Sequence, residues 1–343
     1  MFNRKILGLC LMALVILPNT VYAETVLRFN RWLPPKYFFN TEIMEKWVND
    51  VKTVTQGRVQ IVFTTKSLGP PQRQFDLARD GVADLAWGNP GYVGAPRFVL
   101  PQIAELPMTG ESGEALSVAY WRTHVKYFHK AREYRGTKVI AVHTHAKGGI
   151  FTTGKAIRSI ADLKGMKIRV PNPTTSRLLQ NFGGVPISAT VSKAYEMLSK
   201  GVIDGTFFST DSIVSFRLAS FIKNATHVDG GFFNASFFLV MNQGKWDALS
   251  KSDQAAIERV SGERFAALAG SVWDQKARAA AVTLKKAGMV THTLSAADRA
   301  ELAKQAMAIE TAWIAAASKK GVDAKAALKY YRAQAAAYKP MKK

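Results

Sequence analysis

The sequence contains two copies of one pattern, FDLARDGVADLAW at residues 75–87 and YEMLSKGVIDGTF at residues 195–207. The copies align without a gap around a shared Gly-Val-x-Asp core. Each predicts a helix that ends at its glycine, followed by a short strand, because glycine readily adopts the left-handed conformation that terminates helices. Ligands of open α/β sheets bind beyond the carboxyl ends of the strands, so Trp87 and Phe207 are expected to face a shared cleft. The alternative is a common helix-to-strand connection with both aromatic side chains in a core.

Strands and helices alternate around the first copy. Residues of strand-forming type predict strands at 25–29, 58–63, 82–87, 137–144, 167–170, 202–208 and 237–241. Apolar residues at helical spacing predict helices at 41–54, 70–79, 177–182 and 193–200. The resulting order of strand, helix, strand, helix, strand is typical of an α/β domain with mainly parallel pairing.

From Ser252 onward the chain is predicted to be mostly helical. Residues from 253 to about 286 contain many alanines and few helix breakers, and Ser250 with Asp253 resembles a capping box. Ser295 with Asp298 repeats this start signal for a further long helix. We therefore expect two α/β lobes followed by long C-terminal helices.

The segment SIADLKGMKIRVPNPTT at residues 159–175 places a charged side chain in an apolar strand. Arg169 lies near the end of that strand, just before the turn at Pro171. The planar guanidinium of an arginine in this position can bind a carboxylate through two parallel hydrogen bonds. Pairing with a structural acid, or simple solvation, remains an alternative.

The N-terminus resembles a secretory signal peptide. Arg4 and Lys5 precede an apolar run at 6–18, and Val-Tyr-Ala at 21–23 offers small residues for cleavage after Ala23. The run is shorter than the roughly 20 residues that span a bilayer, although a retained anchor is an alternative. The single cysteine, Cys10, lies inside this segment, so the mature chain is expected to contain no disulfide and no thiolate site.

The composition excludes some classes of function. The formal net charge of +22 is compatible with nucleic-acid binding. However, the basic residues are scattered, and a basic surface also attracts small anions, so we expect no nucleic-acid partner. The sequence has no nucleophile elbow, phosphate loop or dinucleotide-binding motif. His143 and His145 could share a strand face but lack a third ligand nearby, so no metal, cofactor or catalytic residue is predicted.

Several motifs together resemble one family. DLKGMKIRVP at 162–171, FGGVP at 182–186, the two Gly-Val-x-Asp units and Met241-Asn242 are similar to the DctP-type solute-binding proteins of tripartite ATP-independent periplasmic (TRAP) transporters. The resemblance covers nearly the whole mature chain. It implies a periplasmic-binding-protein-like fold of two hinged α/β lobes with mixed sheets, and a long helix that spans both. It also implies that Arg169 pairs with the ligand carboxylate.

The resemblance suggests how the chain is divided. Residues 1–23 form the signal peptide, 24–145 with about 235–290 form the first lobe, and 146–234 form the second lobe. Helices within about 291–343 then pack on the two lobes.

The expected pocket differs from those of the family's sugar-acid and keto-acid binders. Gly148 and Gly149 stand near the position where sugar-acid binders carry a second arginine, and they are expected to leave room for ligand. No acid follows Asp204-Gly205, which argues against a cation-assisted ligand. We therefore expect an aromatic wall, with further polar residues at its far end. The candidate ligand-binding residues are Arg169, Phe207, Phe208, Trp87 and Tyr92, followed by Asn89, Trp32 and Lys147.

We predict that the protein captures a small organic acid in the periplasm and delivers it to the TRAP membrane permease subunits. The acid is expected to be a bulky aromatic or branched monocarboxylate. The protein is expected to be neither an enzyme nor stably inserted in the membrane. Three alternatives remain: an exported enzyme acting on a small organic acid, a ligand-sensing subunit of a receptor, and a binding protein for an ATP-driven transporter.

Overall fold

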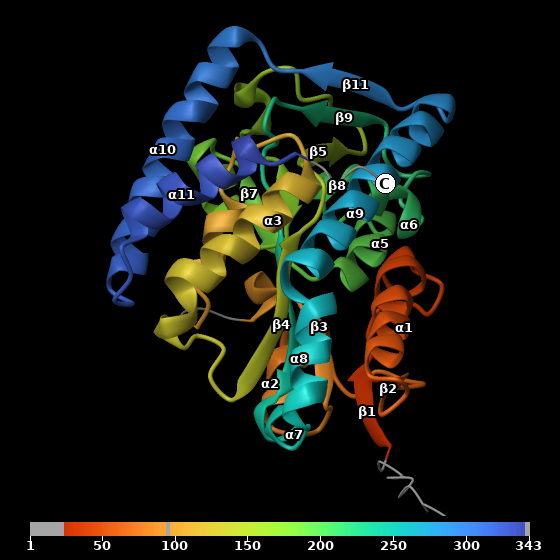
Figure 1. Cartoon of the computed structure of the whole chain (residues 1–343). Coiled ribbons are helices and arrows are strands. Elements are labelled where there is room, and N and C mark those ends of the chain that lie inside the picture. The colour runs from red at the N-terminus through yellow and green to blue at the C-terminus, as the bar shows by residue number, and fades with distance from the viewer. Residues whose placement is uncertain (1–23, 94–96, 340–343) are drawn as a thin grey trace, which may run out of the picture.

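The computed structural model describes residues 24–93 and 97–339. The expected signal peptide, with Cys10, lies outside them. The described chain forms two β-sheets, each covered by helices, and these make up two lobes (Figure 1). We call the five-stranded sheet with its helices the first lobe and the six-stranded sheet with its helices the second lobe. This is the α/β architecture that the sequence predicts.

The first sheet has the order β2-β1-β3-β10-β4. Strand β1 pairs in parallel with β2 and β3, whereas β10 runs antiparallel to both β3 and β4. Its strands are β1 (Thr25–Asn30), β2 (Val59–Phe63), β3 (Leu85–Gly88), β4 (Thr137–Thr144) and β10 (Ser236–Asn242).

The second sheet has the order β11-β9-β5-β8-β6-β7. Here β6 is parallel to β7 and β8, and β5 is antiparallel to β8 and β9. Its strands are β5 (Gly148–Thr152), β6 (Lys167–Val170), β7 (Val185–Ser188), β8 (Gly205–Ser209), β9 (Asn224–His227) and β11 (Val290–Thr293). Strand β11 pairs with β9, so the chain beyond residue 290 supplies a strand to this lobe as well as helices.

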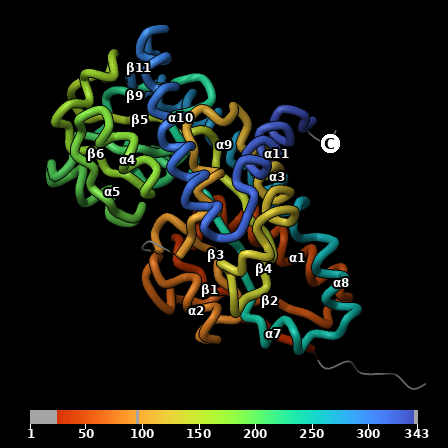
Figure 2. Tube along the Cα trace, turned by 90° about the vertical axis from the view of Figure 1, so that its left-hand side faces the viewer, coloured from red at the N-terminus to blue at the C-terminus, as the bar shows by residue number. Residues whose placement is uncertain are grey.

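Helices pack on both lobes and between them. The α-helices are α1 (Glu45–Val54), α2 (Gln74–Arg79), α3 (Gly113–Thr123), α4 (Pro173–Asn181), α5 (Val191–Ser199), α6 (Thr210–Ser215), α7 (Gln243–Asp247), α8 (Lys251–Val260), α9 (Gly262–Lys286), α10 (Ala296–Ser318) and α11 (Ala324–Ala337). Short π or 3₁₀ turns lie at Phe39–Met44, Pro71–Arg73, Pro90–Tyr92, Leu100–Glu105, His124–Phe128, His129–Ala131 and Ile160–Leu163. Helix α9 packs on α3 and β4 of the first lobe and on α6 of the second (Figure 1). Helix α10 packs on α4 and α11 on α3, beside both lobes (Figure 2).

One predicted helix is broken. The stretch from 253 to about 286 forms α8 and α9, which are separated at Ser261. Gly262 has a φ of +57°, and a side chain there would meet the ring of Trp121, with Cβ 2.7 Å from its nearest atom. Ser261 accepts a hydrogen bond from Trp47 Nε1 at 3.1 Å. The helix therefore ends because of contacts with distant segments, which its own sequence does not reveal. No helix was predicted from the sequence for the residues that form α3.

Candidate functional site

The two lobes meet around a small cavity of about 50 Å³. The carboxyl ends of β1, β3, β6 and β8 lead into it, as expected for open α/β sheets. Six of the eight predicted site residues line it, namely Trp32, Trp87, Asn89, Tyr92, Arg169 and Phe208.

Arg169 is the charged side chain of this cavity. It is 0% exposed, and each of its guanidinium nitrogens donates one hydrogen bond. Nε donates to Ala189 O at 2.9 Å, Nη1 to Phe207 O at 3.1 Å and Nη2 to Tyr92 Oη at 3.1 Å. The guanidinium carbon also lies 4.5 Å from the centre of the Phe208 ring. A guanidinium has five N–H bonds, so both Nη atoms keep a donor without a partner among the described residues.

The Arg169 guanidinium lacks a negative partner. It forms no ion pair with any acid in the described part of the chain, and burial lowers its pKa while the contact with Tyr92 partly raises it again. A buried charge without a counter-charge is unfavourable. A carboxylate that entered the cavity would therefore find a desolvated cation with free donors.

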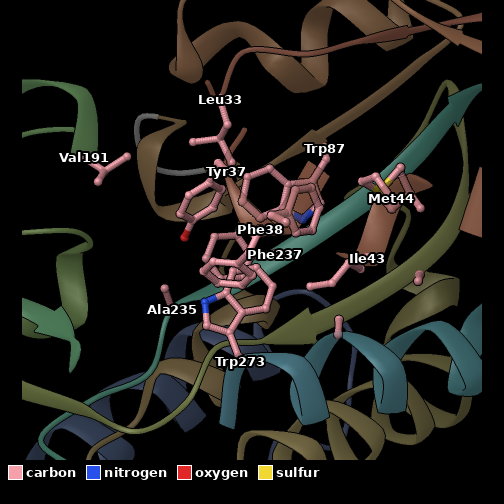
Figure 3. Packing of buried hydrophobic residues seen from close by; sticks show 14 of the residues in the cluster. Leu33, Tyr37, Phe38, Ile43, Met44, Trp87, Val191, Ala235, Phe237 and Trp273 are labelled. Atoms are coloured by element: carbon pink, nitrogen blue, oxygen red, sulfur yellow. The ribbon is translucent and has the colours of Figure 1, made fainter. Parts of the chain in front are cut away.

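The first lobe contributes a stack of flat aromatic rings (Figure 3). Trp87 stacks on Trp32 with centroids 5.5 Å apart and on Phe237 at 4.7 Å. Phe237 in turn stacks on Trp273 of α9 at 5.5 Å. Trp32 Nε1 donates to Trp87 O at 2.9 Å, which fixes the edge of the stack. These rings form an apolar wall suited to a flat ligand.

Two buried histidines support this wall. Trp87 Nε1 donates to His143 Nε2 at 2.9 Å, and Ala235 N donates to His145 Nε2 at 3.1 Å. Burial lowers the pKa of His143 to about 3 and that of His145 to about 4, so both rings are neutral near pH 7 and can accept these bonds. The described residues contain no group of three metal-ligating side chains, and these two histidines have structural partners.

Tyr92 joins the two lobes directly. It ends the turn Pro90–Tyr92 of the first lobe, and its Oη accepts from Arg169 Nη2 and from Val191 N, each at 3.1 Å. Nearby Asn89 accepts from Gly91 N at 2.7 Å, which caps the same turn. The Nδ2 of Asn89 has no partner among the residues described and remains available to a ligand.

An aromatic pair separates the cavity from a hollow on the outside. Tyr37 of the first lobe and Phe216 of the second have ring centroids 5.2 Å apart, and both line the cavity and the outer hollow. Lys36 and Arg217 lie in the outer hollow. Their positive charge favours the approach of an anion to this entrance.

Two of the predicted residues do not line the cavity. Phe207 points to the other face of β8, where its ring packs on Phe232 and Phe233. The gapless match with Trp87 therefore identified the wrong neighbour, because successive strand residues face opposite sides. Its successor Phe208 takes the place in the cavity.

Lys147 and the glycines that follow it also lie elsewhere. Lys147 lines a separate hollow and forms an ion pair with Glu111. The room expected at Gly148 is filled, since a Cβ there would lie 2.1 Å from the Phe233 ring. At Gly149 a Cβ would lie 2.7 Å from His227. These glycines allow close packing and leave no space for ligand.

The cavity also contains residues that the sequence reading did not select. They include Tyr37, His145, Ser209, Ser212, Phe237 and Trp273. Trp273 gave the only local signal, as a lone tryptophan within an alanine-rich helix. The other residues lie in segments that come together only in the tertiary structure.

Residues 29–315 match the model of the DctP family, described as bacterial extracellular solute-binding protein, family 7. A protein of Comamonas testosteroni, named outer membrane transporter protein TsaT, is 31% identical over 98% of this chain and 99% of its own length.

The solved structures similar to this chain include two with bound aromatic acids. A TRAP periplasmic solute-binding protein from Bordetella bronchiseptica, with bound (R)- and (S)-mandelate, has 34% identity and a TM-score of 0.88, covering 91% of this chain and 99% of that one. A TRAP solute-binding protein of an unidentified marine microbe, described as specific for aromatic acids and crystallised with 3-hydroxybenzoate, has 32% identity and a TM-score of 0.85. That match covers 92% of this chain and 99% of that one.

Proposed function

The chain belongs to the family 7 bacterial extracellular solute-binding proteins, and from this premise we propose that its cavity binds an aromatic monocarboxylate. The protein is the solute-binding component of a TRAP transporter: it captures a small organic acid and works with membrane permease subunits. It acts by binding and not by catalysis. Within the described residues, no helix has the length and apolar character needed to cross a bilayer.

The observation that carries the proposal is a single unpaired cation in an aromatic cavity. Arg169 offers free donors on both Nη atoms, so it would pair with one carboxylate. The stacked rings of Trp32, Trp87 and Phe237 favour a flat aromatic body over a branched aliphatic one. The similar proteins with bound mandelate and 3-hydroxybenzoate support the same ligand class.

Binding and closure are coupled in this proposal. Arg169 belongs to the second lobe and the ring stack to the first, so one ligand contacts both lobes only when they are closed. A ligand that makes contacts available only in the closed form shifts the population toward that form. Tyr92 and the pair Tyr37–Phe216 then exclude water from the carboxylate and its partner.

The experiment is calorimetric titration of ligand-free protein with benzoate, mandelate, branched keto acids, succinate and a sugar acid. We expect benzoate or mandelate to bind most tightly, and Arg169→Met to weaken that binding at least 100-fold, because losing a buried charge partner costs about 3–5 kcal/mol. The matched control is Arg177→Met, since Arg177 is exposed on α4. Preference for succinate or the sugar acid, or unchanged binding by Arg169→Met, would contradict the proposal.

The family is extracytoplasmic, and we further propose that export involves cleavage after Ala23. The support is the apolar run at 6–18 followed by Val-Tyr-Ala. N-terminal sequencing of the exported protein is expected to begin at Glu24, and any other start would place the cut elsewhere.

A further inference from the structure

A second polar cluster lies in the cavity, on the segment that joins β8 to α6. Ser209 and Ser212 both line the cavity, and their Oγ atoms lie 3.1 Å apart. They are 1% and 6% exposed, so these hydroxyl groups are removed from bulk water. The proposed pairing of Arg169 with a carboxylate makes no use of them.

A buried carboxylate lies behind this pair. Asp211 is 2% exposed, and its Oδ2 lies 3.5 Å from Ser212 Oγ. Its Oδ1 has no hydrogen-bond partner among the described residues. Burial raises the pKa of Asp211 from 3.8 to about 7, so at pH 8 its carboxylate is ionised and only accepts hydrogen bonds, including the one from Ser212 Oγ. Ser209 Oγ then donates to one lone pair of Ser212 Oγ, and the other lone pair is left for a ligand.

Tyr37 supplies a further hydroxyl group to the cavity. Burial raises its pKa well above the ordinary value, and the nearby Asp211 carboxyl and Tyr92 raise it further, so the phenol keeps its proton and lies close to both groups. Unlike Tyr92 Oη, Tyr37 Oη has no hydrogen-bond partner within the described chain. In Figure 3 this oxygen points away from the ring stack, on the side of Val191 and Ala235. Tyr37 Oη can donate a hydrogen bond to a ligand group that itself donates to Ser212 Oγ.

Arg169 and this cluster line the same cavity. Arg169 Nη1 donates to Phe207 O, and Ser209 follows Phe207 by two residues at the end of β8. One small ligand can therefore contact both the guanidinium and the hydroxyl groups. We infer that Ser209, Ser212 and Tyr37 form a subsite for a hydroxyl group on the aromatic ring of the ligand, so that the ligand is a hydroxylated aromatic monocarboxylate. This inference rests on the proposed function and narrows it.

The chemistry of the subsite also determines what it rejects. A ligand hydroxyl donates to Ser212 Oγ and accepts from Tyr37 Oη, which uses both of its hydrogen-bonding roles. A methoxy group lacks the proton to donate. A second carboxylate would lie near Asp211, and Arg169 is the only lysine or arginine among the described residues that line the cavity. Dicarboxylates are therefore excluded by repulsion as well as by desolvation.

The test is calorimetry at pH 8 on ligand-free protein with benzoate, the three hydroxybenzoate isomers, 3-methoxybenzoate and isophthalate. We expect at least one hydroxybenzoate to bind about tenfold more tightly than benzoate, which corresponds to one well-placed hydrogen bond. The methoxy acid and isophthalate are expected to bind no better than benzoate. The measured quantity is the ratio of the hydroxybenzoate and benzoate affinities.

Two variants test the assignment to residues. Ser212→Ala and Tyr37→Phe are each expected to bring this ratio close to one. Tyr37→Phe keeps the ring packed on Phe216, so the test survives if Ser212→Ala folds poorly. Ser215→Ala, an exposed serine of the same helix, is the matched control and should keep the wild-type ratio.

Other results would overturn the inference. Equal binding of benzoate and every hydroxybenzoate by the wild-type protein would remove the hydroxyl subsite while leaving the proposed function intact. A tenfold preference that persists in both variants would place hydroxyl recognition elsewhere. Absence of binding by every aromatic acid would instead refute the proposed function, and the subsite with it.

Discussion

The two walls of the cavity are built differently. The wall from the first lobe is a continuous stack of rings that also belongs to the hydrophobic core, with Trp87 and Phe237 both buried. The wall from the second lobe presents Arg169, Ser209 and Ser212, whose hydrogen-bonding groups keep unused capacity. Substitutions in the first wall should therefore lower stability together with binding, whereas substitutions in the second should change mainly which ligand is bound.

Phe237→Ala tests the first wall and carries the largest expected effect on stability. The ring of Phe237 lies between Trp87 and Trp273, and removing a buried phenylalanine costs about 3–5 kcal/mol. We expect the melting temperature of ligand-free protein to fall by about 10 °C, and benzoate binding to weaken as well. Differential scanning calorimetry should be carried out on Phe237→Ala and on Ser212→Ala, so that one variant of each wall is compared. Equal melting temperatures for the two variants would show that the walls do not differ in this way.

Tyr92→Phe tests the contact between the two walls. The change removes the Oη that accepts from Arg169 and Val191, and unsatisfied buried donors cost about 2 kcal/mol. We expect benzoate to bind more than tenfold more weakly and small-angle X-ray scattering of the liganded protein to show a larger fraction of open molecules. Tyr195→Phe, on an exposed tyrosine of α5, is the control. Unchanged affinity would mean that Tyr92 Oη does not hold the lobes together.

Glu105 tests a second contact between the lobes, outside the cavity. Its carboxylate accepts from Ser236 Oγ at 2.6 Å, at the start of β10, and from Thr174 Oγ1 of the second lobe at 3.4 Å. Burial raises the pKa of Glu105 from 4.5 to about 7. The folded state therefore binds this proton more tightly than the unfolded state, and the associated stability is present below pH 4.5 and lost as the pH rises to about 7.

Glu105→Gln should remove this pH-dependent loss of stability. The expected effect is the smallest of the three. We expect the melting temperature of the variant, relative to wild type, to rise by a few degrees between pH 5.5 and pH 8, for about 1–2 kcal/mol of linked free energy. His143 and His145 have lowered pKa values and act in the opposite direction, toward lower stability below pH 6.5, but they are present in both proteins. A constant difference across this pH range would show that Glu105 is ionised throughout.

Much of the fold could be predicted from local pattern. The strand at 137–144 is confirmed as β4, and the capping serines Ser250 and Ser295 accept from Asp253 N and Asp298 N as expected. Less of the site could be predicted. The strand β8 is buried along its whole length, so its residues show no alternation that would tell which ring faces the cavity. Both Phe207 and Phe208 were predicted to bind ligand, and only Phe208 lines the cavity.

The sequence by itself determined the class of the protein, because helix caps, strand patterns and the Ile-Arg-Val-Pro motif depend on residues close together in the chain. It also singled out Arg169, since a lone arginine in an apolar strand needs a partner. The tertiary structure decided the cavity. Tyr37, Ser212, Phe237 and Trp273 meet there from segments far apart in sequence, and packing between the lobes determines which of their faces remain free for a ligand.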